Sequence, residues 1–248
     1  MKSILSVAAL LMSSAALAAP ADVAKSAAAD TRSERNVALD ASRKPVELLQ
    51  WAGVEQGDRV LDIFGANLYW AEIVAPAIGS EGRYTIWQPT QFFGEPAQAA
   101  TGAFVQAYPY GDIATARFED LTFEDGAYDF IILNLNAHDF WFVSERFDIP
   151  EMDPAAHVQE VADALAPGGK LLLIDHRGAP TDDPRAQVNA LHRIDPAVII
   201  DVFGDAGLYL KGTNDALAND DDDLSLNVFD EAIAGKTSRF VHLFVKPE

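Results

Sequence analysis

Short apolar segments that suit buried strands alternate along this chain with amphipathic segments that suit helices. Residues 59–63, 129–133 and 170–175 are apolar runs of strand length. Between two of them, residues 153–165 carry apolar side chains at helical spacing after an Asp-Pro start. Strands joined by helices of about 10–15 residues form right-handed βαβ crossovers. The pattern therefore predicts a single α/β domain, Rossmann-like and doubly wound, with a mostly parallel seven-stranded sheet and helices on both faces.

The other expected elements follow the same rules. We predict further helices over residues 45–52, 69–78, 95–107 and 196–204, and further strands at 84–87, 114–118 and 239–246. In sheets of this kind, ligands bind outside the carboxyl ends of the strands. The polar residues that directly follow the predicted strands are therefore the first candidates for a functional site.

The N-terminal segment has the pattern of a secretory signal peptide. Lys2 supplies a positive start, residues 4–17 are uncharged and largely apolar, and residues 16–18 form the small-x-small sequence Ala-Leu-Ala. We expect cleavage after Ala18 and a periplasmic or secreted protein. The alternative, a membrane anchor, is disfavoured because the apolar run is short for a span. Residues 19–35, rich in alanine, are expected to form a flexible leader before a domain at 36–248.

The charge balance bears on the class of partner. The chain has 38 Asp and Glu against 18 Lys and Arg, a net charge of −20. Because phosphate backbones bind clustered Lys and Arg, we expect no nucleic-acid partner and, after cleavage, no membrane partner. A small-molecule substrate is expected, and the oligomeric state stays open. The absence of Cys excludes disulfides, Cys-ligated metals and thiol nucleophiles.

Three stretches together carry a family resemblance. They are Gly-Asp-Arg-Val-Leu-Asp at residues 57–62, the acidic stretch 119–129, and Leu-Ala-Pro-Gly-Gly-Lys at 165–170. In this order and spacing, from about Asp40 to Lys246, the chain resembles the class I S-adenosylmethionine-dependent methyltransferases. Residues 136–139, 192–195 and 229–237 resemble features of a branch of exported predicted methyltransferases from proteobacteria in particular.

The resemblance implies methyl transfer from S-adenosylmethionine to a small molecule, with the cofactor held at a glycine-rich turn after the first strand. Here residues 62–68 have the sequence Asp-Ile-Phe-Gly-Ala-Asn-Leu, with one glycine. Trp87-Gln88 ends the second strand where the family has an acid for the ribose, and Arg117 stands where an acid meets the adenine. The cofactor-binding candidates are Asp62, Gly65, Gln88 and Asn134. For Asp62, capping of the next helix is an equal alternative.

Histidines at the expected active edge are the candidates for proton transfer. His138 and Asp139 follow the strand 129–133, and His176 follows the neighbouring strand, so we predict all three to be catalytic. The predicted substrate contacts are Asn136, His192 and Arg193. Loop-closing hydrogen bonds are the alternative for the Asn residues, and pairing with Asp175 as scaffold is the alternative for Arg193.

Other features are less specific. His138, His176 and His192 make a three-His metal site conceivable, but no short His-x-His spacing supports one, so no metal is predicted. The run 220–223 is expected to be a solvated acidic turn, and residues 140–142 either core or a wall of the site. The alternative function is a non-catalytic periplasmic ligand-binding or interaction module on a degenerate methyltransferase fold.

Overall fold

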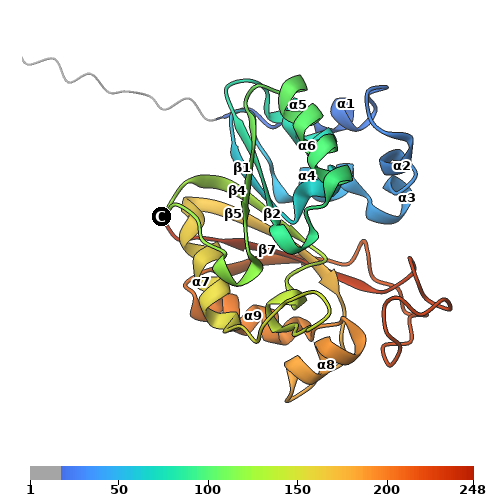
Figure 1. Ribbon diagram of the computed structural model, residues 1–248. Helices are drawn as coiled ribbons and strands as arrows, with labels where there is room; N and C mark the ends of the chain where they lie inside the picture. Colours follow the sequence, from blue (N-terminus) through green and yellow to red (C-terminus); the bar gives the residue numbers. More distant parts are fainter. Residues whose placement is uncertain (1–17) are drawn as a thin grey trace, which may run out of the picture.

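A computed structural model describes residues 18–248 of the chain (Figure 1), so the predicted signal peptide lies almost wholly outside the described residues. Within them, one seven-stranded sheet has the order β3-β2-β1-β4-β5-β7-β6. The strands are β1 (Arg59–Ile63), β2 (Arg83–Pro89), β3 (Gly111–Ala116), β4 (Tyr128–Asn134), β5 (Leu165–His176), β6 (Tyr209–Asn214) and β7 (Arg239–Val245). Neighbours from β3 to β5 pair in parallel, whereas β7 is antiparallel to both β5 and β6. The predicted fold class is confirmed.

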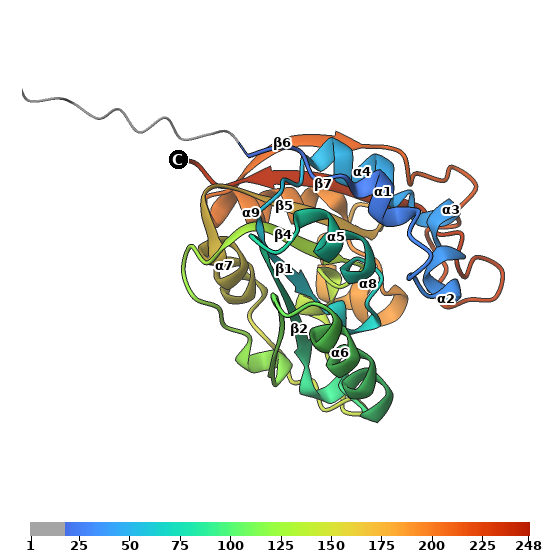
Figure 2. The same ribbon diagram turned by 90° about the horizontal axis from the view of Figure 1, so that it is seen from above.

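Helices cover both faces of the sheet (Figures 1 and 2). They are α1 (Val23–Ala27), α2 (Glu34–Val37), α3 (Asp40–Arg43), α4 (Pro45–Ala52), α5 (Ala71–Ile78), α6 (Glu95–Ala107), α7 (Pro154–Ala164), α8 (Pro184–Leu191) and α9 (Pro196–Asp205). Alternate strand residues build the two cores, because successive side chains of a strand point to opposite faces. Val60 and Ile132 pack with α1, α4, α5 and α6, whereas Leu61 and Ile131 pack with α7, α8 and α9.

Three helices on one face begin with the same capping arrangement. Asp153, Asp183 and Asp195 each precede a proline, and each carboxylate accepts a hydrogen bond from a backbone N–H of the first turn, at 3.0, 3.0 and 2.9 Å. Proline suits the first helical position because its missing N–H would have no partner there. Asp195 caps α9, which was predicted over residues 196–204, whereas α8 and strand β6 were not expected from the sequence.

The expectation of a flexible leader at residues 19–35 is wrong. Helix α1 packs against α4 and α5, and the side chains of Ala21 and Val23 are buried in the core of that face. The buried Arg32 then forms a bidentate ion pair with Asp40, at 2.5 and 2.8 Å. An apolar residue on each side of Asp22 is too short a pattern to show this docking in an alanine-rich stretch. No helix within residues 18–248 combines the length and apolar composition that a membrane span needs.

Candidate functional site

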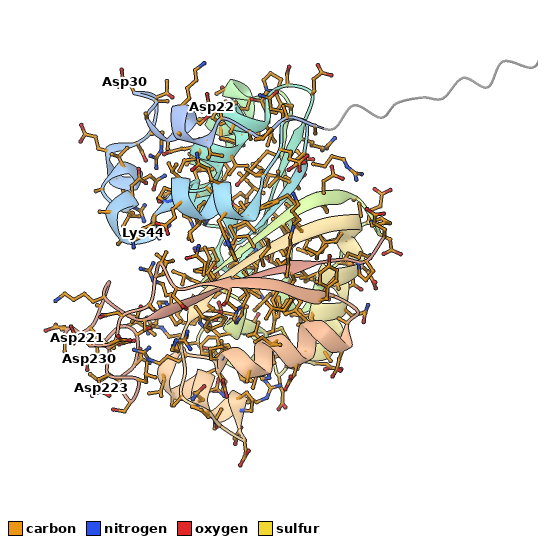
Figure 3. All side chains as sticks on the ribbon, turned by 180° about the vertical axis from the view of Figure 1, so that it is seen from behind. Asp22, Asp30, Lys44, Asp221, Asp223 and Asp230 are labelled. Carbon is orange, nitrogen blue, oxygen red and sulfur yellow. The ribbon has the colours of Figure 1, made fainter. Side chains whose placement is uncertain are left out.

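A cavity of about 460 Å³ opens at the carboxyl ends of β1, β4 and β5. Six predicted site residues line it: Asn134, Asn136, His138, Asp139, His176 and His192. Segments far apart in the sequence flank this edge. Figure 3 shows Lys44, which follows α3, on the same side of the molecule as Asp221 and Asp230 of the loop between β6 and β7. The site therefore combines strand ends with both terminal regions of the domain.

The central pair of the cavity is His138 with Asp175. The His138 Nδ1 atom lies 2.8 Å from Asp175 Oδ1, and the His138 backbone N–H donates to Asp175 Oδ2, also at 2.8 Å. The backbone N–H of His176 donates to Oδ1 of the same carboxylate at 2.7 Å. Asp175 is fully buried, and its strand β5 pairs with β4 up to Asn134. The sheet register thus fixes the orientation of the imidazole.

The second ring nitrogen of His138 faces another acid. His138 Nε2 lies 3.4 Å from Asp139 Oδ1, and Asn136 Nδ2 donates to Asp139 Oδ2 at 2.9 Å. Burial alone lowers the pKa of His138, but the charges of Asp175 and Asp139 outweigh it and raise that pKa to about 9. Burial raises the pKa of Asp139, partly offset by His138 and Asn136. At neutral pH the site therefore holds an imidazolium between two acids.

The other two histidines at this edge are not charged at neutral pH. Burial lowers the pKa of His176 to about 3, and its Nδ1 lies 2.9 Å from Thr237 Oγ1. Burial also lowers the pKa of His192, whose ring packs against Phe142 and Phe229 with centroids 4.7 and 5.1 Å away. The His138 ring centroid is 6.1 Å from that of His176 and 5.6 Å from that of His192. The three predicted histidines are thus brought together.

The geometry that suits a metal differs from the three-His set considered from the sequence. Among the described residues, His138, Asp139 and His192 each offer a ligand atom, all within 4.8 Å of one another, whereas His176 is not in this set. Two His and one carboxylate are ligands that a divalent cation accepts. The 3.4 Å between His138 Nε2 and Asp139 Oδ1 suits an imidazolium beside a carboxylate as well as it suits a metal ion held by both groups. That the site holds no metal therefore remains a prediction.

Arg193 does not contact the cavity, and its predicted role in substrate binding is wrong. It is fully buried, forms a bidentate pair with the fully buried Asp222 at 2.8 and 2.9 Å, and donates to the carbonyl of Leu226 at 2.9 Å. The alternative pairing with Asp175 is wrong too. Because Asp222 is buried with Arg193, the run 220–223 is not simply a solvated turn. The pair anchors the loop between β6 and β7 to the domain.

The turn after β1 keeps a glycine-like backbone but carries large side chains. Phe64 and Leu68 have φ of 63° and 62°, in the left-handed region that favours glycine. At Gly65 a Cβ would lie 2.5 Å from the carboxyl carbon of the buried Asp62, so this position has no room for a side chain. Asp62 accepts a hydrogen bond from the Tyr84 hydroxyl at 2.7 Å, and burial raises its pKa to about 7. Asp62 and Gly65 therefore support the turn from the core side. They line neither the cavity beside His138 nor a second hollow that adjoins it.

A second hollow of about 460 Å³ adjoins the first. The residues that line both are Phe64, Asn67, Phe92 and Asn136. Gln88 lines the second hollow, and its Oε1 accepts from the Ala66 N–H at 3.2 Å, which leaves its amide NH₂ as a donor. The Phe64 ring packs edge-on against Phe118 and Trp87, with centroids 5.1 and 5.7 Å away. Phe64 thus stands where the two hollows meet.

These hollows fit an extended polar molecule such as S-adenosylmethionine in volume and in hydrogen-bonding groups. Each volume lies within the usual range of ligand pockets. Side-chain amides line both ends, with Asn134 and Asn136 over β4 and Gln88 at the end of β2. At the ribose end an amide stands in place of an acid, and Arg117 pairs instead with Glu119 and Asp148 at 2.5 and 2.9 Å.

Several solved structures similar to this chain are described as methyltransferases. A putative sarcosine dimethylglycine methyltransferase from Galdieria sulphuraria superposes with a TM-score of 0.59 at 15% identity, over 88% of this chain and 89% of that one. A SAM-dependent methyltransferase from Aquifex aeolicus gives 0.57 at 15% identity, over 85% and 96%. The [4+2]-cyclase SpnF gives 0.58 at 14% identity, over 84% and 81%.

The similarity shows the fold. No family model matches the chain, and no curated protein sequence matches it. The superpositions alone show that the domain has the fold of solved S-adenosylmethionine-dependent methyltransferases. Because one similar structure is described as a cyclase, function has to be argued from the residues of the site.

Sequence reasoning missed several residues of the cavity. Arg43, Asn67, Phe142, Val228 and Phe229 line it but were not predicted as site residues. Arg43 and Phe229 come from segments outside the strand ends, which no pattern places at this edge. For Phe142, the sequence left open whether the ring belongs to the core or to a wall of the site. The structure places Phe140 and Trp141 in the core and Phe142 at the cavity.

Proposed function

We propose that this protein is an S-adenosylmethionine-dependent methyltransferase that acts on a small-molecule acceptor in the cavity beside His138. The observation that carries the proposal is the buried His138–Asp175 pair, held by hydrogen bonds of 2.8 Å at the carboxyl edge of a methyltransferase fold. A fixed imidazole in a hollow of ligand size is a candidate general base. The adjoining hollow beside Gln88 supplies room for a second molecule.

The chain's own residues divide into two sets. Gln88, Asn134 and Asn136 would hold the cofactor, which supplies an electrophilic methyl group when bound. His138 takes the proton from the acceptor's hydroxyl or amine, and Asp175 fixes the ring and stabilises the imidazolium that results. Because methyl transfer needs alignment of acceptor and methyl group, positioning in the hollow supplies much of the rate enhancement.

The charge state of His138 sets a condition on this mechanism. With a pKa of about 9, most His138 is protonated at neutral pH and cannot accept a proton. The fraction of neutral imidazole, and with it the rate, rises about tenfold per pH unit up to that pKa. His176 is neutral over this range, because burial keeps its pKa low.

The test combines binding and turnover. Calorimetry with S-adenosylmethionine and S-adenosylhomocysteine should give saturable heat, and release of S-adenosylhomocysteine should depend on an added hydroxy or amino acceptor. His138→Asn should retain binding and lose turnover. His157→Asn is the matched control, since His157 lies on α7 and hydrogen-bonds to the Phe118 carbonyl. If neither S-adenosylmethionine nor S-adenosylhomocysteine gives heat at millimolar concentration, the proposal is refuted.

A second candidate function is favoured by Phe64. Its ring at the junction of the hollows supports a ligand-binding module that has lost methyl transfer. Such a module binds a small molecule in the His138 cavity but releases no S-adenosylhomocysteine. Observed turnover excludes it, whereas ligand binding without cofactor binding supports it over the first.

We also propose that the protein is exported. Support comes from the pattern of residues 1–18 and from the packing that follows it. The Gln56 N–H donates to the Ala19 carbonyl at 2.8 Å, and Pro20 bridges to Glu55. Cleavage after Ala18 would leave these contacts intact. Mass spectrometry of the periplasmic or secreted fraction should find a chain that begins at Ala19, and a chain that retains residues 1–18 in the cytoplasm contradicts export.

A further inference from the structure

We infer that the ligand of the His138 cavity carries a carboxylate, which binds Arg43, on an aromatic body. As a statement about the methyl acceptor this deepens the proposed function and rests on it. As a statement about what binds in the cavity, it stands on the geometry of Arg43 and of the aromatic walls. It thus predicts an aryl carboxylate whose hydroxyl or amine reaches His138.

Arg43 is a cation that forms no ion pair with any residue in the described part of the chain. It lines the cavity, and its Nη1 atom is buried without a hydrogen-bond partner within residues 18–248. Asp40 lies on the same helix, but its carboxylate is occupied by Arg32 at 2.5 and 2.8 Å and by the Tyr69 hydroxyl at 2.9 Å. A partly buried guanidinium that has one buried, unpartnered N–H group and no acid in contact is unfavourable. In a chain with 38 acids, an unpaired arginine in a cavity points to an anionic ligand.

The guanidinium of Arg43 is also held in place before any ligand binds. Its central carbon lies 4.2 Å from the centroid of the Tyr69 ring, which is fully buried. The hydrogen bond from Tyr69 to Asp40 fixes that ring. A planar guanidinium stacked on an aromatic face can still donate hydrogen bonds in its own plane, so the part of Arg43 that lines the cavity can bind a carboxylate. The arrangement therefore favours a carboxylate and loses little side-chain entropy on binding.

The walls and mouth of the cavity are aromatic. Phe64 and Phe142 lie within it, and three exposed rings line it towards solvent: Phe92, Phe147 and Phe229, at 38%, 41% and 73% exposure. Phe92 and Phe147 contact each other, with centroids 5.5 Å apart. Exposed aromatic rings gathered at one cavity indicate a ligand-binding surface. A flat aromatic body between these rings fits the cavity better than an aliphatic polar one.

Two molecules could bring a carboxylate to Arg43, the acceptor or the amino-acid end of the cofactor. The experiment separates them by calorimetry on the full chain as purified. The probes are 4-hydroxybenzoate, 4-hydroxyphenylacetate and 3-(4-hydroxyphenyl)propanoate, each with its carboxamide, and S-adenosylhomocysteine. The three acids place the carboxylate at different distances from the ring. The variants are Arg43→Gln and Arg43→Lys, with Arg83→Gln as control, because Arg83 begins β2 and lines neither hollow.

We expect at least one acid to bind about tenfold or more tightly than its amide. Arg43→Gln should abolish that preference and leave S-adenosylhomocysteine affinity within about twofold. Arg43→Lys should retain part of the preference for acids, and Arg83→Gln all of it. Equal binding of acids and amides, or no binding of any acid, overturns the inference. Both outcomes are measured on the unaltered protein, so they do not depend on whether a variant folds. Loss of S-adenosylhomocysteine affinity alone in Arg43→Gln also overturns it. Acid binding without S-adenosylhomocysteine binding keeps this inference and rejects the proposed methyl transfer.

Discussion

Phe64 determines whether the two hollows act as one site, and replacing it with glycine tests this directly. The ring is 8% exposed and packs against Trp87, Phe118 and Phe92. Removing a buried phenylalanine ring costs about 3–5 kcal/mol of unfolding free energy. The backbone φ of 63° costs a non-glycine residue about 1–2 kcal/mol, which glycine recovers.

For Phe64→Gly we therefore expect a net loss of about 2 kcal/mol, since the ring lies at the rim of its cluster and the strain is relieved. In a domain of this size that lowers the melting temperature by about 4–8 °C. Phe64→Ala loses the same ring but keeps the strain, so it should melt lower than Phe64→Gly by a further few degrees. Scanning calorimetry measures both variants.

Phe64→Gly should strengthen ligand binding although it lowers the stability of the domain. Without the ring, the hollow beside Gln88 joins the hollow beside His138, and S-adenosylhomocysteine affinity should rise about tenfold or more, since one contact surface replaces two. Leu68→Gly relieves a similar strain at φ of 62° without opening the junction, and it is the matched control. Unchanged or weaker binding in Phe64→Gly would refute the reasoning, as would equal stability of Phe64→Gly and Phe64→Ala.

Three further predictions concern charge. First, kcat/KM should rise with pH towards the His138 pKa of about 9, and Asp139→Asn should move that limb to lower pH, because one of the two carboxylates that raise the pKa is lost. Stability should change with pH in the opposite sense, because the pKa of His138 in the folded protein lies above the ordinary 6.5. The contribution of the His138–Asp175 pair to the unfolding free energy is complete below pH 6.5 and is lost as pH rises through about 9. Denaturant titrations at several pH values measure this loss. Second, Asp222→Asn should lower the unfolding free energy by about 3–5 kcal/mol, because it leaves the buried Arg193 without its acid; a loss below about 1 kcal/mol in urea titrations would contradict this. Third, dialysis against EDTA should leave binding and turnover unchanged, whereas stoichiometric metal found by elemental analysis would show that His138 holds an ion in place of a proton.

The parts of the site that lie on strand ends were predictable from the sequence. His138 and His176 follow apolar runs that neighbour one another in the predicted sheet, and parallel strands bring their carboxyl ends to one edge. The ring centroids are 6.1 Å apart, which agrees with that reasoning. The Asp195 cap was predictable for a similar reason, since Asp-Pro before an apolar stripe is a local signal that needs no tertiary contact.

The parts that depend on docking of distant segments were not predictable. Arg43 enters the cavity because residues 19–44 pack back onto α4 and α5, and no periodicity marks that packing. Arg193 was assigned to the substrate because it stands beside His192. The side chain instead turns inward to Asp222, 29 residues away in an irregular loop. Adjacent residues at a helix boundary face different ways, and sequence spacing does not determine which one reaches the cavity.

The turn after β1 and the His138–Asp175 pair belong to different elements, so one can change without the other. Phe64 belongs to the turn after β1, which Asp62 and Tyr84 support from within the core. The His138–Asp175 pair depends only on the register of β4 against β5. Bulky side chains in the turn therefore alter what binds beside Gln88 and leave the imidazole in place. A fold that separates the turn from this pair can change what binds beside Gln88 and retain the His138 imidazole in its cavity, which is why cofactor binding and acid binding have to be measured independently.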